Sequence, residues 1–119
     1  MTSSNLYLYG TVALIVLFFA WKKWRAIKMR PIIADYLNKK AVVIDVRSPQ
    51  EFAGGHFEGS INIPLNTLAG KVSTLDKSRP TIVCCASGAR SAVALGILKG
   101  QGFEQVINAG PWTNTLISP

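Results

Sequence analysis

The sequence contains few residues that could cross-link a fold or bind a metal ion. Its 119 residues include only two cysteines, Cys84 and Cys85, and these are adjacent. Neighbouring cysteines cannot join distant parts of a chain, so a fold held together by disulfides is excluded. The single histidine, His56, excludes a zinc site with four Cys and His ligands at the usual spacing. The length allows one modest domain, and a 49% hydrophobic fraction against 16% charged excludes a disordered chain.

Acidic residues are absent from the first 30 positions, which hold five basic residues and a charge of +5. The whole chain has a formal charge of +7, so residues 31–119, with 8 basic and 6 acidic side chains, contribute only +2. A nucleic-acid-binding domain would instead carry its basic side chains over one face of the folded part. The distribution of charge therefore predicts no nucleic-acid partner.

No charged side chain occurs between Met1 and Trp21, and the apolar part of this stretch begins at Leu6. As a helix this apolar part spans about 24 Å, and the uncharged residues before it bring the length to roughly 30 Å, the thickness of a hydrocarbon core. Aromatic residues lie near both ends, as in the interfacial belts of membrane helices. A cleaved signal peptide would carry its positive charge before the apolar run, whereas here the charge follows. A buried core helix is the other alternative, but the basic cluster fits an anchor better.

We therefore expect residues 1–30 to form a transmembrane helix with a basic juxtamembrane segment, in contact with the lipid bilayer, and residues 31–119 to form a folded domain. The five positive charges predict that the chain crosses the membrane once and that its domain faces the cytoplasm. Pro31 predicts a break between the two parts or the start of a helix, and apolar residues from Ile32 to Leu37 recur at the spacing of a short amphipathic helix.

Apolar runs and turn residues alternate through the rest of the chain. β-branched apolar runs predict buried strands, and the segments between them predict helices. This alternation predicts an α/β domain with a mainly parallel central sheet flanked by helices. The expected strands are 41–46, 61–63, 81–85 and 105–107, and the expected helices begin at Pro49, Leu65 and Ser91.

The segment from Cys84 to Ser91 carries the most chemical information. It connects an expected strand to an expected helix at the carboxyl edge of the sheet, where open α/β sheets bind ligands. Small residues let several backbone amides turn inward, the helix adds its positive end, and Arg90 adds a cation. These features favour an anion and would stabilise a cysteine thiolate. The alternative is an ordinary turn with an inert, buried thiol.

Four stretches in family order resemble single-domain rhodaneses, which are sulfurtransferases: residues 43–52, 55–65, 85–91 and 102–106. The short length and the Asn108-Ala109-Gly110 ending are similar to the small phage-shock type. The resemblance implies a rhodanese-like fold and a persulfide mechanism on Cys85 that needs no metal and no organic cofactor. It also implies a thiosulfate or other persulfide donor and a thiol or cyanide acceptor. The implied substrate-binding loop consists of Ala86, Ser87, Gly88, Ala89, Arg90 and Ser91.

Two other functions stay open at this level. Counted from Cys84, Arg90 occupies the position it has in cysteine-dependent phosphatases, although the residues around it fit that pattern poorly. The chain could also be a catalytically idle rhodanese module that recruits a partner at the membrane. The loop departs from the family in the uncharged Ala86 and Ala89, and Pro111 stands where the family often has a second glycine before its terminal helix.

Other polar residues are expected to be structural. Asp45 and Arg47 resemble family residues that brace the loop, and Glu51 is expected to pair with Arg47. His56 matches a family Gly-His turn, where a lone histidine is more often a hydrogen-bonding residue than a base.

Overall fold

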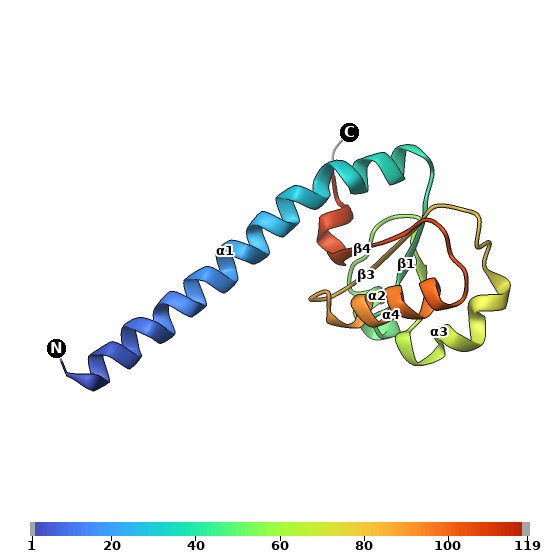
Figure 1. Cartoon of the computed structure of the whole chain (residues 1–119). Coiled ribbons are helices and arrows are strands. Elements are labelled where there is room, and N and C mark those ends of the chain that lie inside the picture. Colours follow the sequence, from blue (N-terminus) through green and yellow to red (C-terminus); the bar gives the residue numbers. More distant parts are fainter. Residues whose placement is uncertain (1, 118–119) are drawn as a thin grey trace.

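A computed structural model describes residues 2–117, which form a long helix followed by a small α/β domain (Figure 1). The strands are β1 (Val42–Asp45), β2 (Ile61–Asn62), β3 (Thr81–Cys85) and β4 (Val106–Pro111). The α-helices are α1 (Ser3–Asn38), α2 (Pro49–Ala53), α3 (Leu65–Lys71) and α4 (Ala89–Gly100), and two short 3-10 helices are η1 (Val72–Thr74) and η2 (Trp112–Thr115).

All strands of the four-stranded sheet are parallel, in the order β2-β1-β3-β4. The two central strands, β1 and β3, are almost wholly buried, as β-branched runs in a parallel sheet require. The predicted α/β fold with a parallel sheet flanked by helices is therefore confirmed. Between β3 and β4 the register shifts by one residue, so that Val83 pairs with Asn108 and Cys84 with Gly110.

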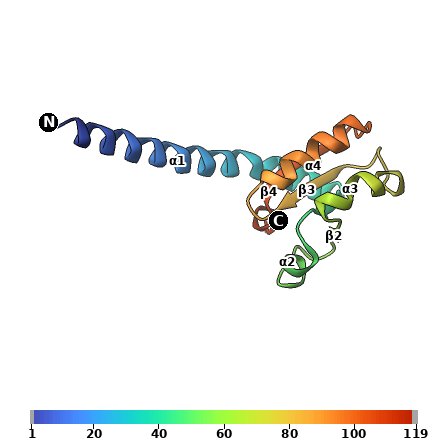
Figure 2. The same ribbon diagram turned by 90° about the horizontal axis from the view of Figure 1, so that it is seen from below.

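Two apolar clusters fill the space on either side of the sheet. The larger contains Val83 and Cys85 from β3, together with Leu68 of α3 and Leu98 of α4. The smaller contains Ile82 and Cys84 with Ile33 of α1, and Trp112 of η2 packs against it. Because successive side chains of a strand point to opposite faces, the two neighbouring cysteines lie in different layers. Figure 1 shows the sheet between the end of α1 and helices α3 and α4, and Figure 2 shows the same domain from below.

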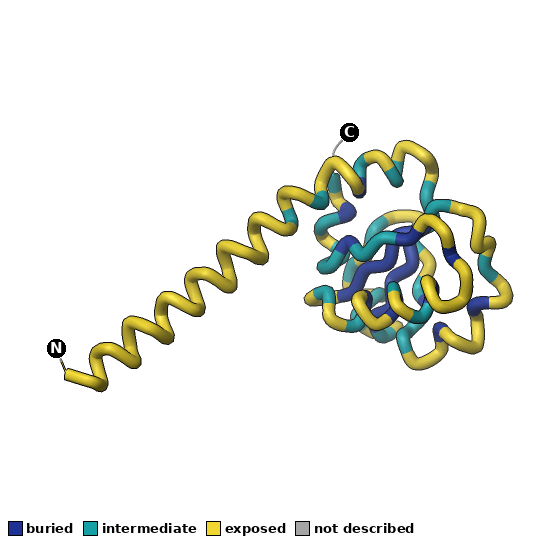
Figure 3. Tube along the Cα trace, viewed as in Figure 1, coloured by how far each residue is buried: buried dark blue, intermediate teal, exposed yellow. Residues whose placement is uncertain are grey.

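Helix α1 begins in isolation and ends against the domain (Figure 3). It is long and apolar enough to cross a membrane. No residue of its most apolar stretch is buried, unlike in the core helix of a soluble protein. Its last turns behave differently, because Ile33 is fully buried in the core. The predicted break at Pro31 is wrong, and the helix passes through it. Met29 before the proline and Ile33 after it pack on the same cluster, which keeps the helix continuous.

Candidate active site

Strand β3 brings Cys85 to the carboxyl edge of the sheet, and α4 starts four residues later. The structure places all the sequence-predicted loop residues here. Cys85 and Ser91 are buried, Ala86, Ser87 and Ala89 are exposed, and Gly88 and Arg90 are half-buried. The loop therefore presents small exposed residues to solvent above a sulfur atom that itself has no exposed surface.

Hydrogen-bond donors surround the Cys85 sulfur. The backbone N–H of Gly88 donates to Sγ at 2.9 Å, and Ser91 Oγ lies 3.3 Å from Sγ. Burial raises the pKa of the Cys85 thiol, but the Ser91 hydroxyl and the backbone amides of Ser91, Gly88 and Ser87 act against it. Their combined effect outweighs burial, so the pKa lies below its ordinary value. These donors favour the charged form of the sulfur, which is the nucleophilic one.

Gly88 gives the loop its shape. Its φ of 104° lies in the left-handed region, where a side chain is strained. A Cβ on this residue would also lie 3.3 Å from the Cα of Gly110 in β4. Asn108 supports the same approach, because its Nδ2 lies 3.5 Å from the Gly88 carbonyl and its Oδ1 accepts the N–H of Gly110 at 2.8 Å. Sequence reasoning missed Asn108, although its position at the carboxyl edge of the sheet was a usable signal.

Arg90 does not point its charge freely into the loop. Its two η nitrogens donate to the two carboxylate oxygens of Glu51 at 2.7 and 2.9 Å. Arg90 holds the pKa of Glu51 down at about 2, with help from hydrogen bonds of Ser48. Ser48 and Glu51 also form a capping box at the start of α2, so one carboxylate caps α2 and holds the first turn of α4. The expected pairing of Glu51 with Arg47 is wrong.

Arg47 pairs instead with Asp45. Arg47 Nη2 lies 2.8 Å from Asp45 Oδ2 in a buried ion pair and donates to the carbonyl of Gly55 at 2.6 Å. Its guanidinium also lies 5.0 Å from the centre of the Trp112 ring. The hydrogen bond to Asp45 raises the pKa of Arg47. This pair braces the end of β1 beside the loop, in agreement with a structural role.

His56 is also structural in its contacts. Its Nδ1 donates to the carbonyl of Phe52 at 2.8 Å, and its ring stacks on Phe52 at 3.7 Å between centroids.

Cys84 differs from its neighbour in the side of the sheet that it faces and in the acidity of its thiol. It is fully buried in the opposite layer, and burial raises the pKa of its thiol to about 12. Among residues 2–117, no group of three or more His, Cys, Asp or Glu side chains could hold a metal ion.

Comparison with known proteins points to one family. The sequence model of the rhodanese-like domain matches residues 32–110. The thiosulfate sulfurtransferase GlpE of Pseudomonas putida is 42% identical over 81 residues, which cover 66% of this chain and 74% of the relative. A solved rhodanese with anions from E. coli is 34% identical, with a TM-score of 0.61, and the match covers 66% of this chain and 94% of that one. The human single-domain sulfurtransferase TSTD1 superposes with a TM-score of 0.65 at 24% identity, over 72% of this chain and 90% of its own, which supports the fold alone.

Proposed function

This chain belongs to the rhodanese-like family, and from that premise we propose that it is a sulfurtransferase in which Cys85 carries the transferred sulfur. The observation that carries the proposal is the Cys85 sulfur itself. It accepts a hydrogen bond from the Gly88 amide and lies beside the Ser91 hydroxyl, and the pKa of its thiol is lowered. The similarity to a thiosulfate sulfurtransferase supports thiosulfate as a donor.

In the first step the Cys85 thiolate attacks the outer sulfur of thiosulfate. A bond forms between Sγ and that sulfur, the sulfur–sulfur bond of thiosulfate breaks, and its electron pair leaves with sulfite. The product is a Cys85 persulfide with one negative charge, and this charge can accept hydrogen bonds from the amides of Ser87 and Gly88. Covalent catalysis of this kind divides one transfer into two easier steps.

In the second step an acceptor takes the outer sulfur. Cyanide or a thiolate attacks it, the bond to Sγ breaks, and the electron pair returns to Cys85 as a thiolate. Cyanide then leaves as thiocyanate, or the acceptor thiol leaves as a persulfide. Because Cys85 has no exposed surface, both steps require the residues around the sulfur to shift enough to admit the donor and the acceptor.

Intact mass spectrometry after incubation with thiosulfate tests the proposal. We expect one added sulfur atom in the wild-type protein and in Cys84→Ala, and none in Cys85→Ala. Cyanide should remove the added sulfur and release thiocyanate. Equal loss in both variants, or no added sulfur in the wild type, would contradict the assignment, and the second result would favour an idle module.

The phosphatase alternative requires Cys84 as a nucleophile. Its burial in the opposite layer and its raised pKa give this alternative no support. Hydrolysis of an aryl phosphate that survives Cys85→Ser would revive it.

We also propose that α1 anchors the enzyme in a membrane as a single span with the domain on the cytoplasmic side. The exposed apolar window and the basic residues that follow it support this location. Alkaline carbonate should leave the full chain in the membrane pellet. Protease should digest the domain in inside-out vesicles and spare it in right-side-out ones, and the opposite pattern would reverse the orientation.

A further inference from the structure

The loop lacks a free cation for a doubly charged donor. Arg90 is the only charged residue between Cys85 and Ser91, and both its η nitrogens already donate to Glu51. The inward-facing amides bind the cysteine sulfur. A dianion that approaches this loop therefore needs positive charge from another part of the molecule.

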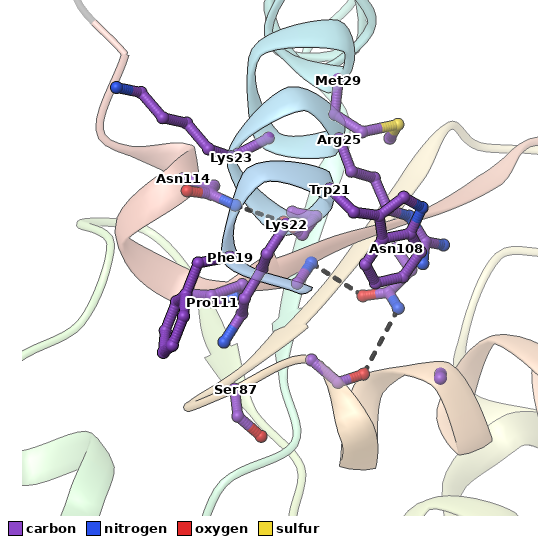
Figure 4. A pocket seen from close by; sticks show the side chains of 15 residues that line it. Phe19, Trp21, Lys22, Lys23, Arg25, Met29, Ser87, Asn108, Pro111 and Asn114 are labelled. Carbon is purple, nitrogen blue, oxygen red and sulfur yellow. Dashed lines mark hydrogen bonds between the residues drawn. The ribbon is translucent and has the colours of Figure 1, made fainter. Parts of the chain in front are cut away.

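Helix α1 supplies that charge. A cavity of about 420 Å³ lies between α1 and the loop, lined on one side by Lys22, Lys23 and Arg25 and on the other by Ser87 and Gly88. We call it the α1–loop cleft. Figure 4 shows the Lys22 side chain extending from α1 toward the loop at Ser87. No acidic residue is among the described residues that line this cleft.

The placement of these cations follows from helix periodicity. Lys22, Arg25 and Met29 recur at spacings of three and four, so they share one face of α1. Met29 packs against the core, which turns this face of the helix toward the domain. Within residues 2–117 the ion pairs are Lys39–Asp35, Arg47–Asp45 and Arg90–Glu51, so neither Lys22 nor Arg25 has an acidic partner there. Arg25 lies over the ring of Trp21, 5.2 Å from its centre.

We propose that the α1–loop cleft binds the anionic sulfur donor, a small sulfur oxoanion with two negative charges, through Lys22 and Arg25 before the donor reaches Cys85. This inference rests on the proposed function, and it gives the basic end of the anchor a role in substrate binding. A cation at each of two adjacent turns matches the charge of thiosulfate or sulfite. The polar groups of Ser87 and Asn114 at the same cleft provide further hydrogen-bonding partners.

Two double variants of equal charge test the proposal. Lys22→Gln with Arg25→Gln removes two of the three cations that line the cleft, the two that share the Met29 face of α1. Lys28→Gln with Arg30→Gln removes the same charge from the same helix at positions that do not line it. The full chain is placed in phosphatidylcholine nanodiscs at low salt. We expect the first pair to raise the KM for thiosulfate about 5- to 20-fold with kcat nearly unchanged, and the second pair to change KM less than twofold, because only nearby charges act strongly through water.

Calorimetric binding of sulfite to the Cys85→Ser variant gives a readout that does not depend on turnover. We expect sulfite to bind. Lys22→Gln with Arg25→Gln (the cleft pair) should weaken this binding, and Lys28→Gln with Arg30→Gln (the control pair) should not. Equal weakening by both pairs, or by neither, would overturn the proposal, because the cations would then act as a general surface charge or on lipid phosphate. The proposal would also be overturned if the cleft cations bound phosphatidylglycerol and not sulfite. In that case no sulfite binding would be detected, and Lys22→Gln with Arg25→Gln would abolish phosphatidylglycerol binding while the control pair would not. If sulfite binds as expected but no sulfur is transferred, the proposed function fails and the cleft stands.

Discussion

At Cys85, burial and hydrogen bonding act on one sulfur in opposite directions, and Ser91 provides a way to separate them. The Ser91 hydroxyl lies 3.3 Å from Sγ and 3.1 Å from the Gly88 carbonyl, so it can turn its proton to a thiolate. Replacing Ser91 with Ala removes this donor and should raise the pKa of Cys85. Because one pKa unit changes the thiolate fraction about tenfold, we expect several-fold slower alkylation near neutral pH.

Alkylation rate against pH measures this effect. The wild-type rate should rise with pH and reach its midpoint below the ordinary value of 9.0, and the midpoint of Ser91→Ala should move upward. Ser87→Ala is the control, because only the backbone amide of Ser87 contributes to the lowered pKa. An unchanged midpoint in Ser91→Ala would show that the hydroxyl does not stabilise the thiolate.

Gly88 is a position in the loop at which we expect no other residue to be tolerated. A Cβ there combines a φ of 104° with a 3.3 Å approach to Gly110. The left-handed conformation alone should cost about 1–2 kcal/mol in the free energy of unfolding of Gly88→Ala, and the displaced amide should slow persulfide formation.

Gly96→Ala is the matched control in the same helix. A Cβ at Gly96 meets no atom within 4 Å, so this change should stabilise α4 by roughly 0.5–1 kcal/mol. Chemical denaturation of the full chain in detergent compares the two variants. A Gly88→Ala protein as stable and as active as the wild type would contradict this account of the loop.

Residue-level prediction from the sequence works where the partners are local. Cys85 and its loop can be located because strand, small residues and helix start follow one another in the chain. The partner of Glu51 cannot be found in this way. Arg47 is four positions away, but Glu51 contacts Arg90, 39 positions away, because the sheet brings the starts of α2 and α4 together.

Among the helices and strands, the Glu51–Arg90 pair links α2 to α4 and should behave as a coupled unit. Glu51→Gln keeps the capping box possible, since Gln also serves at that position, but it removes the charge that Arg90 needs. Arg90→Lys removes the bidentate geometry. We expect each change to lower the melting temperature slightly, and the double variant to lower it less than the sum of the two.

Thermal unfolding of the four proteins gives this cycle directly. Ser48→Ala tests the cap separately, because it removes the side chain that accepts the Glu51 amide and leaves Arg90 in place. Fully additive losses from Glu51→Gln and Arg90→Lys would mean that the pair does not connect the two helices energetically.

The elements differ in how well the sequence predicts them. Strand β3 matches its predicted bounds, because five consecutive buried residues leave little alternative. Strand β4 extends to Pro111, well beyond the predicted 107, since Asn108, Gly110 and Pro111 are poor strand formers that pair only because β3 lies beside them. The continuous α1 was missed for a similar reason, because packing on the sheet outweighs the local effect of Pro31.

For the whole molecule, Cys84 should limit stability in alkali. Burial raises the pKa of its thiol in the folded protein to about 12, against an ordinary value of 9.0. Between these values the unfolded chain loses the proton and the folded chain keeps it, so the free energy of unfolding falls as pH rises. Below about pH 9 both states keep the proton and this contribution is constant.

Urea unfolding between pH 8 and about 11 measures this loss of stability as the slope of the free energy of unfolding against pH. Cys84→Ala should be less stable than the wild type below pH 9 because it leaves a cavity, but its stability should fall less steeply above pH 9. Identical slopes in the two proteins would assign the alkaline loss to other groups.

Helix α1 continues without interruption from its exposed apolar half to Ile33 in the core, so no flexible linker separates the apolar half from the domain. Between Trp21 and Ile33 the helix rises about 18 Å, and the loop faces Lys22 and Arg25, near the start of this segment, across the α1–loop cleft. An unstructured linker would instead let the domain change its orientation and its distance from the apolar half of α1. With α1 inserted in a membrane as proposed, the helix would hold the loop close to the bilayer surface. The continuous helix would then confine sulfur transfer to a thin layer next to the bilayer, and a protein acceptor would have to present its thiol within that layer.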